Sequence, residues 1–225
     1  ISKIEVASPF SFFNEANNAP NLVFDFQRFD GKMYAGGPKG FFVLNKDSNR
    51  FEEVPGNFGM VWDLLLFEDK MLVGTGSAVY ELYKNGAFKK LLGREVTYLF
   101  RSKLNANRVF IGNDRGLAAM YYENDSWTLE KVFNEIHYTV ARIVETANGD
   151  LWLGLDSNKV AKLSIQSHTK NRANSPEIRI FSPEDGLPDD IGKLYVIREE
   201  LYFASDNKAF RYHSKTAEFI VLDFT

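Results

Sequence analysis

The chain has 225 residues and a formal net charge of −3, from 27 Lys and Arg against 30 Asp and Glu. A hydrophobic fraction of 44% beside 25% charged residues excludes a disordered chain. The balanced charge argues against nucleic acid as a partner. The sequence contains no stretch of about 18 apolar residues, so no membrane span is predicted. Cysteine is absent, which excludes disulfides, thiolate zinc sites and cysteine nucleophiles.

The chain is rich in aromatic residues, with 20 Phe, 10 Tyr and 3 Trp, a bias that favours strands. Five segments repeat one pattern: an apolar strand, a polar turn, a second strand ending in a small residue, and a third strand. The small residues are Gly36, Gly74, Gly112, Gly154 and Ala204. Their spacings of 38, 38, 42 and 50 residues match the period of about 40–50 residues of a four-stranded propeller blade.

We therefore predict an all-β fold, a β-propeller of about five four-stranded blades in a single domain over residues 1–225. The predicted blades are 22–56, 57–93, 94–134, 135–182 and 188–225. Five blades could close alone or form an open part of a larger array, and the opening Ile1-Ser2-Lys3 suggests a piece of a longer chain.

Local patterns support the strand assignment. Short turns join the first strand of a repeat to the second, and the expected turns are Asp30-Gly31, Glu68-Asp69, Asn148-Gly149 and Glu199-Glu200. The small residue that follows should let a neighbouring blade approach closely. A helix over 136–146 or 160–166 is the alternative on propensity, but the β-branched residues and the place of 136–146 in the repeat favour strands.

Three segments carry a family resemblance. Phe181–Pro188 (FSPEDGLP) resembles the F-x-x-E-D-G-L-P motif of two-component regulator propeller repeats. Asn148–Gly154 (NGDLWLG) is similar to the N-G-x-L-W-I-G core of that family, and Asn113–Leu117 (NDRGL) to its T-x-x-G-L turn. The resemblance extends from about Leu22 to Leu222, although the first, second and fifth repeats are degenerate.

The resemblance implies a sensor. Members of the family are the extracytoplasmic, ligand-sensing parts of membrane-bound bacterial signalling proteins, followed by a β-sandwich, a membrane helix and a histidine kinase or diguanylate cyclase domain. It therefore implies a periplasmic location, or one at the outer face of the inner membrane. The implied partners are an extracellular small molecule or oligosaccharide and neighbouring domains of the same polypeptide. The chain itself would not insert into the membrane, and a homodimer is also considered.

The sequence indicates no catalytic or metal centre, and we expect no cofactor. His137, His168 and His213 are scattered without a metal-binding spacing. The acidic turns lack the spacing of a calcium loop, and Asx turns explain them. Asp185–Pro188 is interpreted as a turn that places Leu187 between blades.

Ligand binding is the remaining function. Loops that enter the innermost strands and turns between second and third strands share one face of a propeller. The candidate ligand-binding residues on this predicted face are Trp62, Asn113, Arg115, His137, Tyr138, Asp156 and Asp206; Lys39, Lys159 and Lys208 lie beside them. Aromatic rings next to amides and charges suit a sugar or a peptide, whereas packing between blades is the alternative role for Trp62 and Tyr138.

Two other functions are considered. A glycan-degrading enzyme would need converging carboxylates, and Asp63 and Asp156 are the candidates on the inner face. A protein-interaction scaffold would show an exposed apolar patch. The predicted function is non-catalytic.

Overall fold

The computed structural model describes residues 13, 15–164, 176–188, 193–198, 200–205, 208–214 and 216–222. These residues form five four-stranded antiparallel sheets and two short 3-10 helices, η1 (Glu15–Asn17) and η2 (Pro183–Asp185). The all-β fold with about five propeller blades is therefore confirmed. The helical alternatives are wrong, because β13 lies within 136–146 and β15 covers residues 160–164 of the second segment; residues 165 and 166 lie outside the described ranges.

Each sheet is built from four strands that are consecutive in the chain. The first sheet consists of β1 (Asp25–Phe29), β2 (Lys32–Gly37), β3 (Gly40–Asn45) and β4 (Arg50–Glu53). The second consists of β5 (Val61–Phe67), β6 (Lys70–Thr75), β7 (Val79–Leu82) and β8 (Phe88–Leu92). The third consists of β9 (Tyr98–Arg101), β10 (Arg108–Asn113), β11 (Gly116–Glu123) and β12 (Ser126–Phe133). The fourth consists of β13 (Val140–Glu145), β14 (Asp150–Leu155), β15 (Lys159–Ser164) and β16 (Glu177–Phe181). The fifth consists of β17 (Lys193–Ile197), β18 (Glu200–Ala204), β19 (Ala209–His213) and β20 (Glu218–Leu222).

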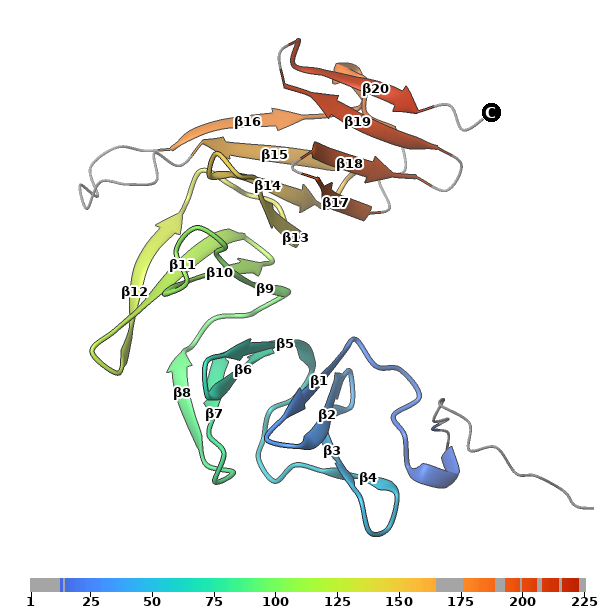
Figure 1. Ribbon diagram of the computed structural model, residues 1–225, viewed down its shortest axis with the longest axis vertical. Helices are drawn as coiled ribbons and strands as arrows, with labels where there is room; N and C mark the ends of the chain where they lie inside the picture. Colours follow the sequence, from blue (N-terminus) through green and yellow to red (C-terminus); the bar gives the residue numbers. More distant parts are fainter. Residues whose placement is uncertain are drawn as a thin grey trace, which may run out of the picture.

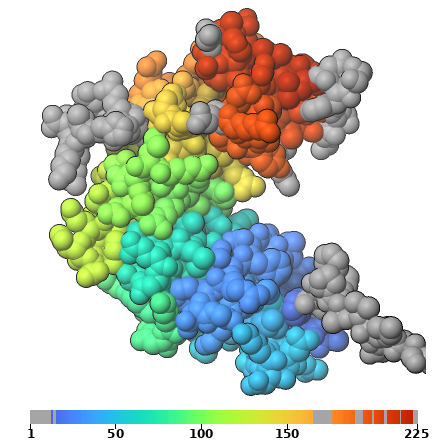
Figure 2. Space-filling view, viewed as in Figure 1, coloured from blue at the N-terminus to red at the C-terminus, as the bar shows by residue number. Residues whose placement is uncertain are grey.

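The five sheets follow one another around an arc (Figure 1). The first strand of each sheet lies on the inner side, and these strands are neighbours in the order β1, β5, β9, β13, β17. The fourth strands lie on the outer side of the arc. Figure 2 shows an opening between the first sheet, in blue, and the last, in red, so the described sheets form an open ring.

Tight turns set the hairpin registers. Asp30 and Gly31 join β1 to β2 with φ angles of 47° and 69°, the left-handed pair that a two-residue hairpin requires. In the fifth sheet Ile197 pairs with Glu200. The turn predicted at Glu199-Glu200 is thus wrong at Glu200, which already belongs to β18, while Glu199 lies outside the described residues.

In the first three sheets the small residue of the repeat marks a close approach to the next sheet, as predicted, whereas at Gly154 the nearest atoms belong to Arg142 of its own sheet. A Cβ atom added to Gly36 would lie 2.6 Å from Cγ1 of Val61, and one added to Gly74 would lie 2.6 Å from Cγ1 of Val96. Val61 begins the next inner strand, and Val96 lies two residues before another, β9. Only a residue without a side chain leaves room for the valine, so glycine here sets the distance between sheets.

The hydrophobic core is divided into four clusters, each between two consecutive sheets, and we call these boundaries seams. Aromatic ring contacts, mostly edge-to-face, fill the seams between the first and second sheets and between the fourth and fifth. In the second of these seams Trp152 stacks on Phe181 and meets Tyr212 edge-to-face. Leu187 is buried in the last cluster, as its place in the turn predicted. The fold is therefore stabilised by separate apolar contacts at the seam between each pair of consecutive sheets.

The first and last sheets each have one face that points away from the neighbouring sheet, and we call these two faces the outer faces. Both expose apolar side chains. Phe26 is 56% exposed on β1 and Ile197 is 53% exposed on β17. Successive side chains of a strand point to opposite faces of the sheet. Phe29 and Leu194, each three residues away on the same strand, therefore lie on the opposite face, where they are buried in the seams. In the described part of the chain no helix has the length and apolar character needed to cross a membrane.

Candidate functional site

The inner strands place one residue from each sheet at the same level of the channel. This residue is paired with the small residue of the repeat in every sheet. We call the five residues the inner ring; they are Asp25, Asp63, Tyr98, Arg142 and Lys193. Along the arc the described side chains of the ring change from two acids through a tyrosine to the guanidinium of Arg142.

A β-bulge directs Trp62 to the same region. The register of β5 against β6 shifts between Val61 and Asp63, which leaves Trp62 as the extra residue. Bulges commonly re-aim a side chain next to a functional site. The Trp62 ring stacks on Phe24, just before β1, with centroids 4.6 Å apart and planes at 6°. Phe24 is 37% exposed, so the pair presents an aromatic surface beside the inner ring.

The acidic part of the inner ring joins three sheets. The amide of Leu64 donates to Oδ2 of Asp25 at 3.0 Å and to Oδ1 of Asp63 at 3.1 Å. The amide of Leu99 donates to Oδ2 of Asp63 at 2.6 Å. Asp25 thus links the first sheet to the second, and Asp63 links the second to the third.

Burial governs the protonation of this pair. It raises the pKa of Asp63 to about 7, against the hydrogen bond from Leu99, and the charge of Asp25 adds to the rise. Burial also raises the pKa of Asp25, whereas the Leu64 amide and the charge of Arg142 lower it. The pair therefore takes up a proton as the pH falls through about 7.

The guanidinium of Arg142 in the inner ring has hydrogen-bond donors that could bind a ligand. Nη1 of Arg142 donates to the Tyr98 hydroxyl at 3.1 Å, and the guanidinium lies 5.0 Å from the centre of that ring. Among the described residues, Arg142 forms no ion pair. A half-buried guanidinium with only a neutral partner retains donors for a ligand oxygen.

The other sequence-predicted residues lie on turns of the third and fourth sheets. Asn113 is buried, and its Oδ1 accepts from the Arg115 amide at 2.9 Å. The Arg115 side chain is 87% exposed beside Asp114. Oδ1 of Asn113 thus stabilises the β10–β11 turn, which gives this residue a structural role.

His137 and Tyr138 lie in the connection to β13, and Asp156 lies in the β14–β15 turn. His137 and Asp156 are exposed. Tyr138 packs against the cluster between the third and fourth sheets, and its hydroxyl accepts from Nζ of Lys159 at 2.9 Å. Asp206 and His168 lie outside the described residues.

The structure does not join Asp63 to Asp156 as a carboxylate pair. Asp63 instead has Asp25 as its carboxyl neighbour, and both of its oxygens accept backbone amides. Within the described ranges no group of three or more acidic or histidine side chains gathers to hold a metal ion.

Sequence reasoning missed Phe24, Asp25, Tyr98 and Arg142. A signal for the three ring residues was present in the repeat, because each lies 11 to 14 positions before the small residue with which it pairs. Following the hairpin back from the small residue finds them. Phe24 has no such signal, since its role depends on the bulge at Trp62.

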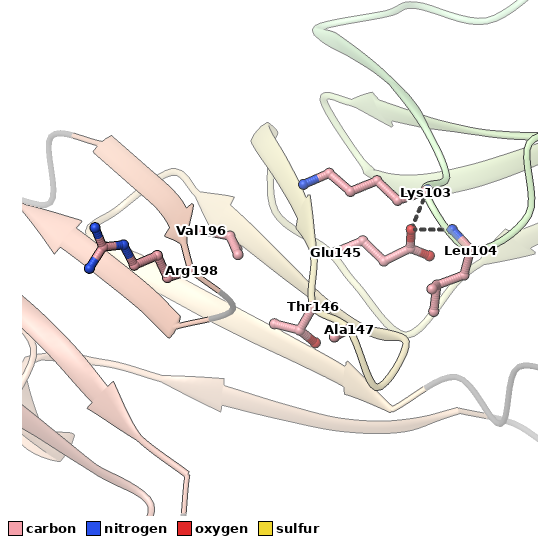
Figure 3. Close-up of a pocket in the computed structure, with 7 residues that line it drawn as sticks. All are labelled: Lys103, Leu104, Glu145, Thr146, Ala147, Val196 and Arg198. Atoms are coloured by element: carbon pink, nitrogen blue, oxygen red, sulfur yellow. Dashed lines mark hydrogen bonds between the residues drawn. The ribbon is translucent and has the colours of Figure 1, made fainter.

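Two shallow pockets lie on the opposite side, near the turns that follow the inner strands. One, of about 270 Å³, is lined by residues of the third, fourth and fifth sheets, including Lys103, Glu145 and Arg198. In Figure 3 the Glu145 carboxylate lies against the backbone at Lys103 and Leu104, and the Arg198 side chain extends away from it. The other, of about 620 Å³, lies between the first two sheets. Neither pocket includes a candidate residue of the predicted face.

Comparison with known proteins finds no matching family model and no matching curated protein. Among solved structures, the chain is similar to the extracellular domain of a hybrid two-component system from Bacteroides thetaiotaomicron, with a TM-score of 0.70 and 14% identity over 93% of this chain and 31% of that one. It is also similar to PorZ, a surface component of the type-IX secretion system of Porphyromonas gingivalis, with a TM-score of 0.60 and 12% identity over 88% and 28%.

A third similar structure is virginiamycin B lyase from Staphylococcus aureus, with a TM-score of 0.58 and 15% identity over 90% of this chain and 70% of the lyase. The chain thus spans less than a third of the first two proteins. At these identities the likeness shows the fold alone. The chain is a β-propeller of about five blades.

Proposed function

We propose that this chain is the ligand-binding propeller of an extracytoplasmic bacterial sensor of the two-component regulator type. Its ligand would be a carbohydrate, bound at the end of the channel where the inner strands begin. The observation that carries the proposal is the aromatic pair Phe24–Trp62 beside the inner ring.

The chemistry of this region suits a sugar. Flat aromatic surfaces pack against the C–H faces of sugar rings, while a few placed polar groups bind the hydroxyls. Trp62 and Phe24 supply the surface, and Arg142 and Tyr98 supply donors and acceptors. The fold-level likeness to the extracellular domain of a hybrid two-component system supports a sensing role.

In the proposed protein, binding would be relayed to a kinase or cyclase domain by rigid-body repositioning at an interface. The propeller would lie in the periplasm or at the outer face of the inner membrane. The candidate residues His137, Arg115 and Asp156, exposed on the same predicted face, would form the outer edge of the site.

A catalytic function is the second candidate, because a lyase shares this fold. The contacts of Asp63 do not favour it. Both of its carboxyl oxygens accept backbone amides, so neither is directed at a substrate. We therefore assign no reaction to the chain.

The test is binding to an immobilised panel of neutral and acidic oligosaccharides. Trp62→Ala should abolish any binding found, because it removes the stacking surface, while a half-exposed side chain contributes little to folding. Leu129→Ala is the matched control, since Leu129 is exposed on the outer strand β12. The proposal is wrong if no oligosaccharide binds, or if Trp62→Ala binds as well as the control.

A further inference from the structure

The Asp25–Asp63 pair is a contact between two acids that crosses a seam of the propeller. The two carboxyl groups converge on one amide, that of Leu64, and the charge of Asp25 raises the pKa of Asp63. Two ionised carboxylates that converge on one amide in a poorly solvated place repel each other, so this arrangement favours a proton on one of them.

The surroundings of the pair leave it without a strong counter-charge. The strands β2 and β6 place Gly36 and Gly74 opposite the two acids, and neither carries a side chain. From β9 the pair receives the amide of Leu99, with Tyr98 as the neighbouring ring residue. The positive charge of Arg142, on β13, lowers the pKa of Asp25 only weakly. β17 places Lys193 at the equivalent level.

We propose that Asp25 and Asp63 form a proton-operated latch between the first and second sheets. With one proton the two carboxyls hold each other and the inner strands stay joined. Loss of that proton places two negative charges side by side in a poorly solvated seam, and the repulsion favours separation of β1 from β5. The latch does not depend on which ligand the chain binds.

The sign of the pH effect follows from the raised pKa values. The folded chain retains a proton that the unfolded chain loses at lower pH, since burial raises the pKa of Asp63 from 3.8 to about 7. The stabilisation is fully present below the unfolded value and is lost as the pH rises towards 7. The unfolding equilibrium constant should therefore increase at least about tenfold between pH 5 and pH 8.

The experiment is urea unfolding of the whole chain from pH 5 to pH 9. Asp63→Asn is the key variant, because an amide keeps a donor for Asp25 and an acceptor for a backbone amide without a titrating proton. We expect this variant to lose most of the pH dependence and to exceed the wild type in stability at pH 8. Asp47→Asn, in the exposed β3–β4 turn, is the control and should behave as wild type.

Two further measurements keep the test decisive. Carbon-13 NMR of the wild-type Asp carboxyls should show one with a midpoint near neutral pH. Hydrogen exchange of β5, corrected for the intrinsic pH effect, should accelerate above that midpoint as the Leu64 amide opens. The latch is refuted if all Asp carboxyls titrate below pH 5, or if Asp63→Asn keeps the wild-type pH dependence. If Asp63→Asn does not fold, Asp25→Asn is measured by the same criterion.

Discussion

The seam at Gly74 gives the sharpest test of how the sheets are spaced. In Gly74→Ala the new Cβ would lie 2.6 Å from Cγ1 and 3.1 Å from Cβ of Val96, and 3.3 Å from Cδ1 of Leu99. Val96 cannot easily move, because it is fully buried and its amide donates to the Thr75 carbonyl at 2.9 Å. Overpacking a rigid site costs about 1–3 kcal/mol, so we expect a loss of unfolding free energy in that range.

Urea unfolding followed by circular dichroism measures this loss as a lower midpoint with an unchanged slope. Gly76→Ala is the matched control two residues away. Its Cβ would meet nothing nearer than Met60 at 3.9 Å, and the site is exposed. The control should stay within about 0.5 kcal/mol of wild type.

A double-mutant cycle separates the steric cause from other effects. Val96→Ala removes the methyl groups that a new Cβ would meet, so the double variant should be more stable than the sum of the two single losses predicts. A coupling of at least about 1 kcal/mol is expected for groups in contact. Additive effects, or a neutral Gly74→Ala, would refute the view that this glycine sets the distance between sheets.

Three other substitutions test contacts within and between sheets by the same unfolding measurement. Glu145→Ala should lower the free energy of unfolding by about 2–3 kcal/mol, because the Ser102 hydroxyl and the amides of Lys103 and Leu104 lose their acceptor. Glu145→Gln should lower it less, and equal losses for the two variants would contradict this role. Trp152→Ala should cost about 3–5 kcal/mol through the cavity left between the fourth and fifth sheets, and a loss below 1 kcal/mol would show that the seam collapses around the gap. Arg108→Gln should cost about 1 kcal/mol, by breaking the two-point contact with Glu130; an effect that does not shrink in high salt would point to lost packing instead.

The repeat predicted the architecture because one physical constraint recurs in the first three units, at Gly36, Gly74 and Gly112. A small residue is required wherever the next inner strand crosses, and Gly36 and Gly74 show this directly. The turn predicted at Glu199-Glu200 was misplaced because two adjacent glutamates look alike in the sequence, and only strand pairing assigns Glu200 to β18.

The site was less predictable because it depends on contacts between repeats. Trp62 was found from its residue type, but its stacking on Phe24 requires a bulge that no local pattern marks. Asn113 was selected as a polar residue on the predicted face, yet it is buried and serves its own turn. The proton shared by Asp25 and Asp63 could not be anticipated, since each residue alone looks like an ordinary strand acid.

The apolar outer faces of the terminal sheets have a consequence for self-association. The face that carries Phe26 differs from the one that carries Ile197, so a contact between them would be heterologous, one copy's leading end against the next copy's trailing end. Such contacts grow into rings or filaments rather than stopping at symmetric pairs. Concentrated solutions of this chain should therefore form a ladder of oligomers.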